Sequence, residues 1–265
     1  EHERVVMGVL DGRVACITGG TRGIGLGIAK GFLDEGAMVV VNGRDPSKAE
    51  QTLAALDAGD RVHFIAGDVK QREACEAIVD GTVDHFGRID ILVANAGGAT
   101  GHAPIVDLTD EAMADSLVWN FWHTFWTMRR AFHYMIPQQY GRVMSVSSLE
   151  GKVGKPGISI YVVAKHAING LTKSAAHEVG TLGITVNALC PGAIETDIMM
   201  AEGPAAAESM GLDYQGLLDM FAQESAIKRL NEVEDVAAVA TLLASEAGAG
   251  ITGSLISIDG GTAPY

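Results

Sequence analysis

Seven short apolar segments, rich in β-branched residues, alternate with longer segments along almost the whole chain. The apolar segments cover residues 14–18, 38–42, 61–67, 89–97, 141–148, 183–190 and 253–259. Strands that are apolar on both faces are covered on both sides. Strands that alternate with helices form parallel sheets through right-handed crossovers. The pattern therefore predicts an α/β fold, with a doubly wound parallel sheet of about seven strands and helices on both faces.

The segments between the predicted strands carry apolar residues at helical spacing. Helices are expected near 24–36, 46–56, 70–86, 110–136, 158–180 and 232–245. A length of 265 residues suits one domain. We therefore assign residues 1–265 to a single domain, with residues 1–10 as an N-terminal tail.

The charge of the chain limits its partners. Nineteen Lys and Arg stand against 33 Asp and Glu, which gives a net charge of −14. Such a chain repels nucleic acid and anionic membranes. No apolar run is long enough to cross a bilayer, and the N-terminus lacks the apolar core of a secretory signal. Three cysteines without a CxxC pair indicate reduced thiols. We expect a cytoplasmic protein with a small-molecule partner, no nucleic acid, no membrane and no metal.

The segment "TGGTRGIG" (18–25) follows the first predicted strand. Its glycines allow a tight turn and a close approach to a pyrophosphate, and the next helix points its free N–H groups at that charge. The spacing differs from the common GxGxxG, and an ordinary strand-to-helix connection is also compatible with it. The residues expected to contact a dinucleotide here are Gly19, Thr21, Arg22, Gly23, Ile24 and Gly25.

The end of the second predicted strand reads "NGRD" (42–45), where dinucleotide sites recognise the adenosine ribose. An acid there binds the free 2′-hydroxyl of NAD, whereas an arginine accommodates the 2′-phosphate of NADP. Arg44 and Arg22 are available, while Asp45 beside Pro46 fits a helix cap better. NADP(H) is therefore favoured, and NAD(H) stays possible because both arginines could be solvated surface residues.

Two further strand ends carry residues suited to a dinucleotide. The third ends in "GDV" (67–69), where Asp68 could accept a hydrogen bond from the adenine amino group and Val69 could pack on the ring. The fourth ends in "ANAGG" (94–98), whose small residues allow close passage beside a cofactor. Each of these ends is unremarkable by itself.

Ser148, Tyr161 and Lys165 have a spacing that predicts catalysis. Tyr161 follows Ser148 by thirteen residues, and Lys165 lies one helical turn after Tyr161 on the same face. A phenol has a pKa near 10, and a neighbouring ammonium and a cationic nicotinamide would lower it. Tyr161 could then exchange a proton with a carbonyl or alcohol oxygen that Ser148 orients. Each residue alone fits an ordinary structural role, but together with the glycine turn they indicate an active site.

These motifs resemble the short-chain dehydrogenase/reductase family. The resemblance rests on "TGGTRGIG", "NAG" (95–97), Ser148, "YVVAK" (161–165) and "PGAIET" (191–196), which run in the family's order. It covers nearly the whole chain, including the "ITG…IDGG" ending (251–261), and implies a Rossmann-like fold. Ala94 stands where many members carry a second Asn.

The resemblance implies a role for each matching residue. Tyr161 would be the acid/base, Lys165 would lower its pKa and bind the nicotinamide ribose, and Ser148 would polarise the substrate. Asn120, 28 residues before Ser148, would hold a water in a proton relay to the lysine. The remaining cofactor contacts that the resemblance implies are Asn95, Ala96, Gly97, Pro191, Gly192, Ile194 and Thr196.

The function implied is an oxidoreductase that transfers a hydride between NADP(H) or NAD(H) and a ketone or secondary alcohol. A 3-oxoacyl reductase, a hydroxybutyrate-like hydroxy-acid dehydrogenase and a dehydrogenase of sugars, cyclic alcohols or steroids stay open as activities. A non-catalytic NADP(H)-sensing scaffold is the rival class. The resemblance also implies a dimer face, usually within a homotetramer.

Residues 197–228 separate the last cofactor motif from the final helix and are expected to form a helical substrate lid. Four methionines and several glycines there suit a segment that repacks on binding. His102 and Glu150 could also touch the substrate. Four aromatic residues near 119–126 are expected to fill the core and a subunit interface: Trp119, Trp122, Phe125 and Trp126.

Overall fold

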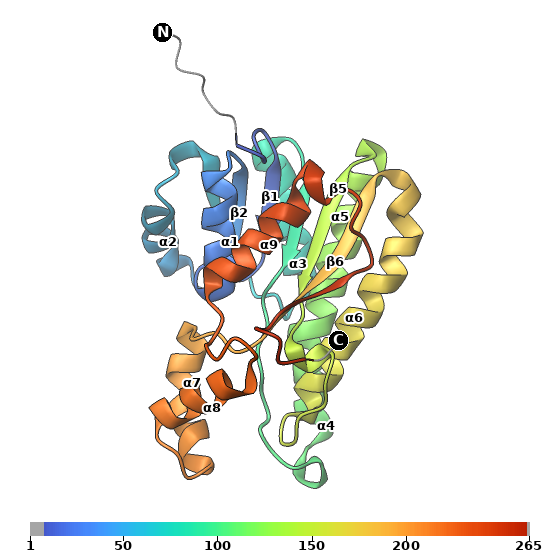
Figure 1. Ribbon diagram of the computed structural model, residues 1–265. Coiled ribbons are helices and arrows are strands. Elements are labelled where there is room, and N and C mark those ends of the chain that lie inside the picture. The colour runs from blue at the N-terminus through green and yellow to red at the C-terminus, as the bar shows by residue number, and fades with distance from the viewer. Residues whose placement is uncertain (1–7, 264–265) are drawn as a thin grey trace.

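A seven-stranded parallel sheet forms the centre of the molecule, in the order β3-β2-β1-β4-β5-β6-β7. The structure is a computed structural model that describes residues 8–263. The predicted doubly wound α/β fold is confirmed (Figure 1). The strands are β1 (Val14–Ile17), β2 (Met38–Gly43), β3 (Val62–Ala66), β4 (Ile91–Ala94), β5 (Gly141–Val146), β6 (Ile184–Pro191) and β7 (Leu255–Ile258).

Two helical layers cover the sheet. One face is packed by α1 (Gly23–Asp34), α2 (Ala49–Leu56) and α9 (Val233–Ala244). The other face is packed by α3 (Arg72–Phe86), α5 (His123–Gln138) and α6 (Ser159–Val179). The remaining helices are α4 (Asp110–Leu117), α7 (Asp197–Ser209) and α8 (Tyr214–Glu224).

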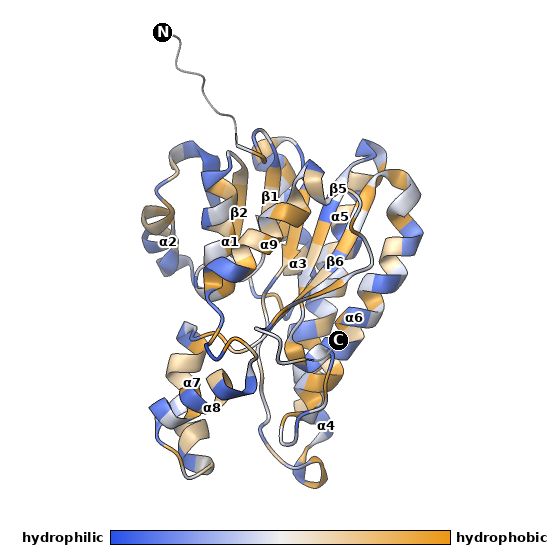
Figure 2. Ribbon diagram, in the orientation of Figure 1, coloured by the Kyte–Doolittle hydropathy of each residue, from blue (hydrophilic) through white to orange (hydrophobic). Residues whose placement is uncertain are grey.

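Alternation along each strand divides the core between the two faces. In β1, Ala15 and Ile17 pack on the side of α1 and α9, whereas Cys16 between them packs on the side of α3 and α5. All three side chains are fully buried, and the strands are the most apolar part of the fold (Figure 2). This double burial explains why the strands read as continuous apolar runs rather than alternating ones.

The order of the strands reverses between β1 and β4. These two strands pair in parallel, yet the chain leaves β1 toward β2 on one side and leaves β4 toward β5 on the other. Ligands of doubly wound sheets bind beyond the carboxyl ends of the strands at such a point. The loops after β1, β4 and β5 therefore define where a site is expected.

Two other sequence predictions concern the N-terminal tail (1–10) and the helical lid (197–228). Residues 1–7 of the predicted tail lie outside the described residues, but Leu10 is completely buried and its N–H donates to the carbonyl oxygen of Glu35 at 3.0 Å. The folded part therefore begins earlier than the tail boundary at residue 10. The predicted lid is helical, since α7 and α8 occupy most of it and lie beyond the carboxyl edge of the sheet (Figure 1). Within residues 8–263, no helix is both long and apolar enough to cross a membrane.

Candidate active site

A cavity of about 1610 Å³ opens at the carboxyl ends of the strands. Its walls come from the loops after β1, β2, β4, β5 and β6 and from the inner faces of α7 and α8. The reversal of strand order, the glycine turn and three of the predicted catalytic residues, Ser148, Tyr161 and Lys165, meet there. The cavity has the dimensions and position of a joint cofactor and substrate site.

The glycine turn after β1 forms one wall. Gly19 has a φ of +63°, in the left-handed region that favours glycine, and an added Cβ would lie 3.1 Å from the Asn95 side-chain nitrogen. The Asn95 amide donates to the carbonyl oxygens of Thr18 and Gly19 at 2.9 and 3.0 Å, which ties the turn to the end of β4. Gly25 lies behind the turn, where an added Cβ would meet Gly19 and Asn95. This cradle and the N-terminus of α1, which starts at Gly23, fit a dinucleotide pyrophosphate.

The end of the cavity beside β2 carries positive charge and no acid. Arg22 and Arg44 line it and are exposed, and neither has an ion-pair partner among residues 8–263. Asn42 at the strand end donates to the carbonyl oxygens of Ile65 and Gly67, both at 3.1 Å. The Asp45 carboxylate accepts from the backbone N–H of Ser47 at 2.9 Å, so its predicted role as a helix cap is confirmed.

The third strand end differs from expectation. Val69 lines the cavity, but Asp68 does not, and its carboxylate accepts from the backbone N–H of Lys70 at 3.0 Å. Asp68 thus stabilises the turn that precedes α3. Its side chain would have to leave that turn to meet an adenine amino group.

A buried histidine that the sequence gave no reason to single out supports the same wall. His123 Nε2 lies 2.9 Å from the Thr18 hydroxyl, which itself accepts from the backbone N–H of Asn95 at 3.0 Å. The hydroxyl therefore donates to an unprotonated Nε2, and Nδ1–H donates to the carbonyl oxygen of Trp119 at 3.2 Å. Burial, followed by the Lys165 charge, lowers the pKa of His123 to about 4, so the ring is neutral at pH 7.

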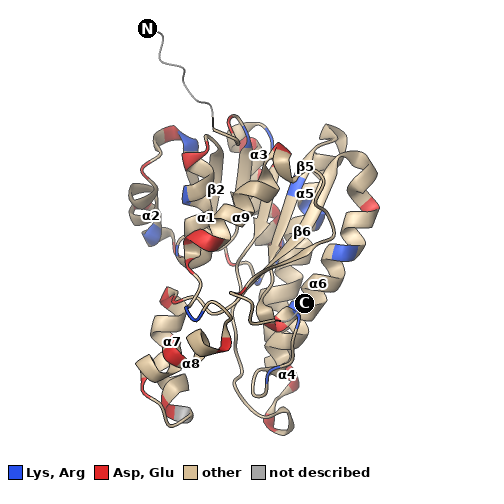
Figure 3. Ribbon diagram, viewed as in Figure 1, with Lys and Arg blue, Asp and Glu red and all other residues tan. Residues whose placement is uncertain are grey.

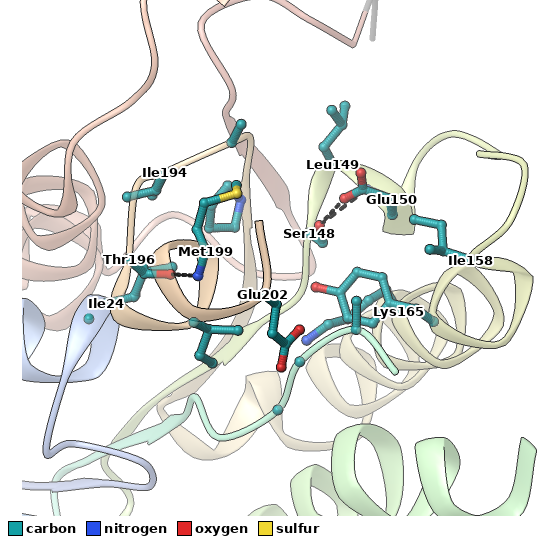
Figure 4. Close-up of a pocket in the computed structure, with 18 of the residues that line it drawn as sticks. Ile24, Ser148, Leu149, Glu150, Ile158, Lys165, Ile194, Thr196, Met199 and Glu202 are labelled. Carbon is teal, nitrogen blue, oxygen red and sulfur yellow. Dashed lines mark hydrogen bonds between the residues drawn. The ribbon is translucent and has the colours of Figure 1, made fainter. Parts of the chain in front are cut away.

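Ser148, Tyr161 and Lys165 lie together on the side of the cavity opposite the glycine turn. Figure 4 shows Ser148 and Lys165 on this side. Ser148 follows β5 and caps the short turn η5 (Leu149–Gly151), while the other two side chains project from α6. The Lys165 ammonium donates to the carbonyl oxygen of Val146 at 2.8 Å and lies 5.3 Å from the centroid of the Tyr161 ring. The structure therefore brings the predicted triad together across the cavity from the glycine turn.

The electrostatics of the triad differ from the expected ones in one respect. Burial raises the pKa of Tyr161, the Glu150 charge raises it further, and only a hydrogen bond with Ser148 acts in the opposite direction. The expected lowering by Lys165 is not found. Burial lowers the pKa of Lys165 itself to about 8. In this state the phenol holds its proton.

Asn120 sits in a turn that the sequence did not predict. The expected helix over 110–136 is interrupted by a π-helical turn, η4 (Val118–Trp122), between α4 and α5. Asn120 is fully buried there, and its side chain accepts from the N–H of Gly98 and donates to the carbonyl oxygens of Gly98 and Ser116. Its side-chain oxygen faces Gly97, as does the Lys165 ammonium. Such turns often mark functional positions in helices.

The remaining predicted residues fall into two groups. Most line the cavity, but Gly25, Asp68 and Asn120 do not reach its wall. Thr196 caps α7 by accepting from the N–H of Met199 at 3.4 Å, and it lies beside Gly23, where an added Cβ would be 3.4 Å from the threonine methyl. The predicted cofactor contacts at the lining are Gly19, Thr21, Arg22, Gly23, Ile24, Arg44, Val69, Asn95, Ala96, Gly97, Tyr161, Lys165, Pro191, Gly192, Ile194 and Thr196.

The substrate side contains residues that the sequence raised as candidates. His102 and Glu150 both line the cavity, as do Met199 and Met210 of the lid region. Trp119 also lines it and packs over Gly98, where an added Cβ would lie 2.9 Å from the indole. Its expected place against the core is confirmed, since it packs on the cluster beneath α3, α5 and α6, and its second contact with the cavity was not expected.

Comparisons with known proteins agree with this geometry. The family model described as short chain dehydrogenase matches residues 13–207. The chain is 36% identical to a D-beta-hydroxybutyrate dehydrogenase of Rhizobium meliloti over 254 residues, covering 94% of this chain and 98% of that protein. It is 34% identical to the 3-oxoacyl-acyl-carrier-protein reductase FabG of Vibrio cholerae, covering 95% and 98%. A solved structure of an actinorhodin polyketide ketoreductase variant with NADPH superposes with a TM-score of 0.91 at 30% identity, covering 96% and 98%.

Proposed function

The chain belongs to the short-chain dehydrogenase family of NAD(P)-dependent oxidoreductases acting on CH–OH groups, and we propose that Ser148, Tyr161 and Lys165 carry its reaction. The observation that supports these roles is their convergence on one cavity, across from a glycine turn that fits a dinucleotide. When bound, the nicotinamide cofactor supplies a hydride to a carbonyl carbon or accepts one from a carbinol carbon.

The residues of the chain handle the proton that accompanies the hydride. In reduction, Tyr161 donates its phenolic proton to the substrate oxygen, so that a ketone gains one hydride and one proton. The Ser148 hydroxyl, which donates to Glu150 Oε2 in the structure, would turn to donate its proton to the same oxygen and fix its position. Lys165 stabilises the phenolate that is left, and the proton is then replaced from solvent. In oxidation, Tyr161 takes the hydroxyl proton in the reverse sense.

Asn120 and Lys165 are proposed to bind a water through which solvent returns the proton that Tyr161 has donated. Both face Gly97, and Asn120 is buried in the π-helical turn between α4 and α5. A buried water between them would find the polar partners that such a water needs.

NADP(H) is proposed as the preferred cofactor. Arg22 and Arg44 line the cavity at the ribose end, and the end of β2 offers Asn42 and Gly43 in place of a carboxylate. Guanidinium groups suit a 2′-phosphate, because they donate several charge-assisted hydrogen bonds to its oxygens. NAD(H) use at lower affinity stays compatible with this arrangement.

The substrate is proposed to be a ketone or secondary alcohol bound beneath the lid of α7 and α8. A 3-oxoacyl reductase and a hydroxybutyrate-like hydroxy-acid dehydrogenase are the alternatives that the relatives' activities raise. The net charge of −14 argues against docking an acidic acyl carrier. The non-catalytic sensor considered from the sequence is set aside, because the chain belongs to an enzyme family.

A homotetramer built through the outer faces of α5 and α6 is also proposed. Trp122 is 41% exposed and stacks on Trp126 with ring centroids 5.9 Å apart, and Val163 of α6 is 45% exposed. Trp122 ends η4 just before α5, and exposed large apolar side chains such as these favour a protein interface. A cytoplasmic location stays a prediction from the sequence.

The proposed function is tested by following the loss of NADPH absorbance against a panel of ketones. Turnover is expected for the wild-type enzyme and a large loss for Tyr161→Phe. Equal turnover by the two proteins would contradict the proposed role of Tyr161.

A further inference from the structure

The catalytic serine is hydrogen-bonded to a carboxylate. The Ser148 hydroxyl donates to Glu150 Oε2 at 2.5 Å, and the N–H of Glu150 points back to the Ser148 oxygen at 3.3 Å (Figure 4). The Glu150 side chain is 16% exposed and lines the cavity. Its charge acts on both other triad members, since it raises the pKa of Tyr161 and opposes the lowering of that of Lys165.

The cations near this end of the cavity already have partners. Lys165 donates to the carbonyl oxygen of Val146. Lys155 lies 4.0 Å from Glu150 and 4.7 Å from the centroid of the Phe221 ring. It therefore neutralises the negative charge of Glu150 only in part. Arg229 pairs with Asp235 at 3.0 Å. Among the described residues of this region, the structure offers a substrate carboxylate no cation without a partner.

The lid adds more negative charge over the same space. The segment from Asp197 to Glu224 contains no Lys or Arg, and Figure 3 shows acidic residues in red on both of its helices. Glu202 of α7 extends its carboxylate into the cavity (Figure 4). Glu224 of α8 also lines the cavity. The acids of the segment are Asp197, Glu202, Glu208, Asp213, Asp219 and Glu224.

We propose that Glu150 is a specificity-determining residue that excludes substrates with a carboxylate close to the reacting carbon, so that the enzyme acts on uncharged or cationic ketones and alcohols. The proposal rests on the proposed function, in which the reacting oxygen contacts Ser148 and Tyr161. Because Glu150 touches the same serine, a carboxylate within two bonds of the carbonyl is forced near it. Two like charges a few ångströms apart in a partly buried site repel by enough to lower binding about 10- to 100-fold.

A matched pair of ketones tests this discrimination. Acetoacetamide and acetoacetate have nearly the same shape and differ by one negative charge. Reduction with NADPH is the suitable direction, because the reduced nicotinamide ring carries no positive charge that would attract the acid. The quantity measured is the ratio of kcat/KM for the amide to kcat/KM for the acid, which cancels a general loss of active enzyme.

Two variants are chosen to move that ratio in opposite directions, and two others are chosen to leave it nearly unchanged. The wild-type enzyme is expected to favour the amide by about 100-fold, and Glu150→Gln is expected to reduce the ratio about tenfold. Glu150→Asp keeps the charge and is expected to keep most of the ratio. Lys155→Gln removes the partial offset and is expected to raise it. Glu208→Gln, on the same lid but away from the cavity lining, is the matched control and is expected to leave it unchanged.

The outcomes separate this inference from the proposed function. A wild-type ratio near one, or an equal ratio in the wild type and Glu150→Gln, would overturn the role of Glu150 while the reductase activity stands. A fall of the ratio in Glu208→Gln as large as in Glu150→Gln would also overturn it. Absence of turnover of the amide, the acid and every other ketone tried would overturn the proposed function and this inference together.

Discussion

Tyr161 and Lys165 lie one helical turn apart on α6, with the Lys165 ammonium 5.3 Å from the centroid of the Tyr161 ring. The ammonium is anchored by the carbonyl oxygen of Val146 and lies over the ring. This position suits the stabilisation of a phenolate after proton transfer. It does not ionise the phenol beforehand, because burial and Glu150 both raise the pKa of Tyr161.

Replacing Tyr161 by Phe removes the proton donor and keeps the ring. We expect kcat/KM for ketone reduction to fall by about 10²–10⁴-fold, the usual contribution of a positioned acid. The dissociation constant of NADPH, measured by fluorescence, should change little. Tyr134→Phe is the control, since that hydroxyl donates to Asp80 at 2.8 Å on an outer helix. A loss of activity of equal size in the two variants would argue against a catalytic phenol.

Replacing Lys165 by Met should change the pH dependence of stability in the enzyme without cofactor. The folded pKa of about 8 lies below the ordinary 10.5, so between these values the unfolded chain binds more protons than the folded chain. Stability contributed by this site therefore rises with pH across that window. Relative to Lys165→Met, the wild type should gain up to about 3 kcal/mol in its free energy of unfolding from pH 8 to 10.5.

Denaturant unfolding at several pH values measures this difference. The exposed Lys173 of the same helix provides the control, because Lys173→Met should follow the wild type at every pH. Parallel curves for the wild type and Lys165→Met would show that the buried ammonium carries no such penalty.

The fold was predictable because its signals are local and repeated. Strands such as β1 and β5 are buried on both faces, so their apolar runs stand out in the sequence, and alternation with helices specifies a parallel sheet. Ser148, Tyr161 and Lys165 could be found because a fixed spacing on a strand end and one helix turn brings them together. The order of the strands depends on packing between distant segments, and the sequence alone did not supply it.

Other features of the site depend on contacts that no local pattern reveals. The π-helical turn around Asn120 and the pairing of His123 with Thr18 each join segments far apart in the chain. The pKa of Tyr161 was expected to fall because its lysine is close in sequence, whereas the burial that raises it comes from the tertiary structure. Asp68 looked like a ligand because of its strand end, but the turn after β3 already uses its carboxylate.

Substituting His123 should reduce the acid sensitivity of the fold. Its folded pKa of about 4 lies below the ordinary 6.5, so the stability it contributes is complete above pH 6.5 and is lost as pH falls toward 4. Protonation would also break the hydrogen bond that Nε2 accepts from Thr18. Both the wild type and His123→Gln lose unfolding free energy between pH 6.5 and 4. The loss in His123→Gln should be smaller than that in the wild type by up to about 3 kcal/mol.

The exposed His166 supplies the control for that experiment, since His166→Gln should leave the acid sensitivity unchanged. The free energies are obtained from urea unfolding in buffers of constant ionic strength. An acid sensitivity of His123→Gln equal to that of the wild type would mean that the ring is not held neutral by its surroundings.

Replacing Arg44 by Ala should weaken NADP binding much more than NAD binding. The guanidinium lines the ribose end of the cavity without a protein ion pair among residues 8–263, so it is free to receive a 2′-phosphate. Hydrogen bonds between charged groups contribute roughly 1.5–3 kcal/mol, which predicts a dissociation constant for NADP about 10- to 100-fold higher, with NAD nearly unchanged. Calorimetric titration of both cofactors measures the two constants, and Lys48→Ala, an exposed cation outside the lining, should alter neither. Equal weakening of the two cofactors by Arg44→Ala, or a wild-type enzyme that binds NAD more tightly, would reject the preference for NADP, because only the 2′-phosphate distinguishes the two ligands at this position.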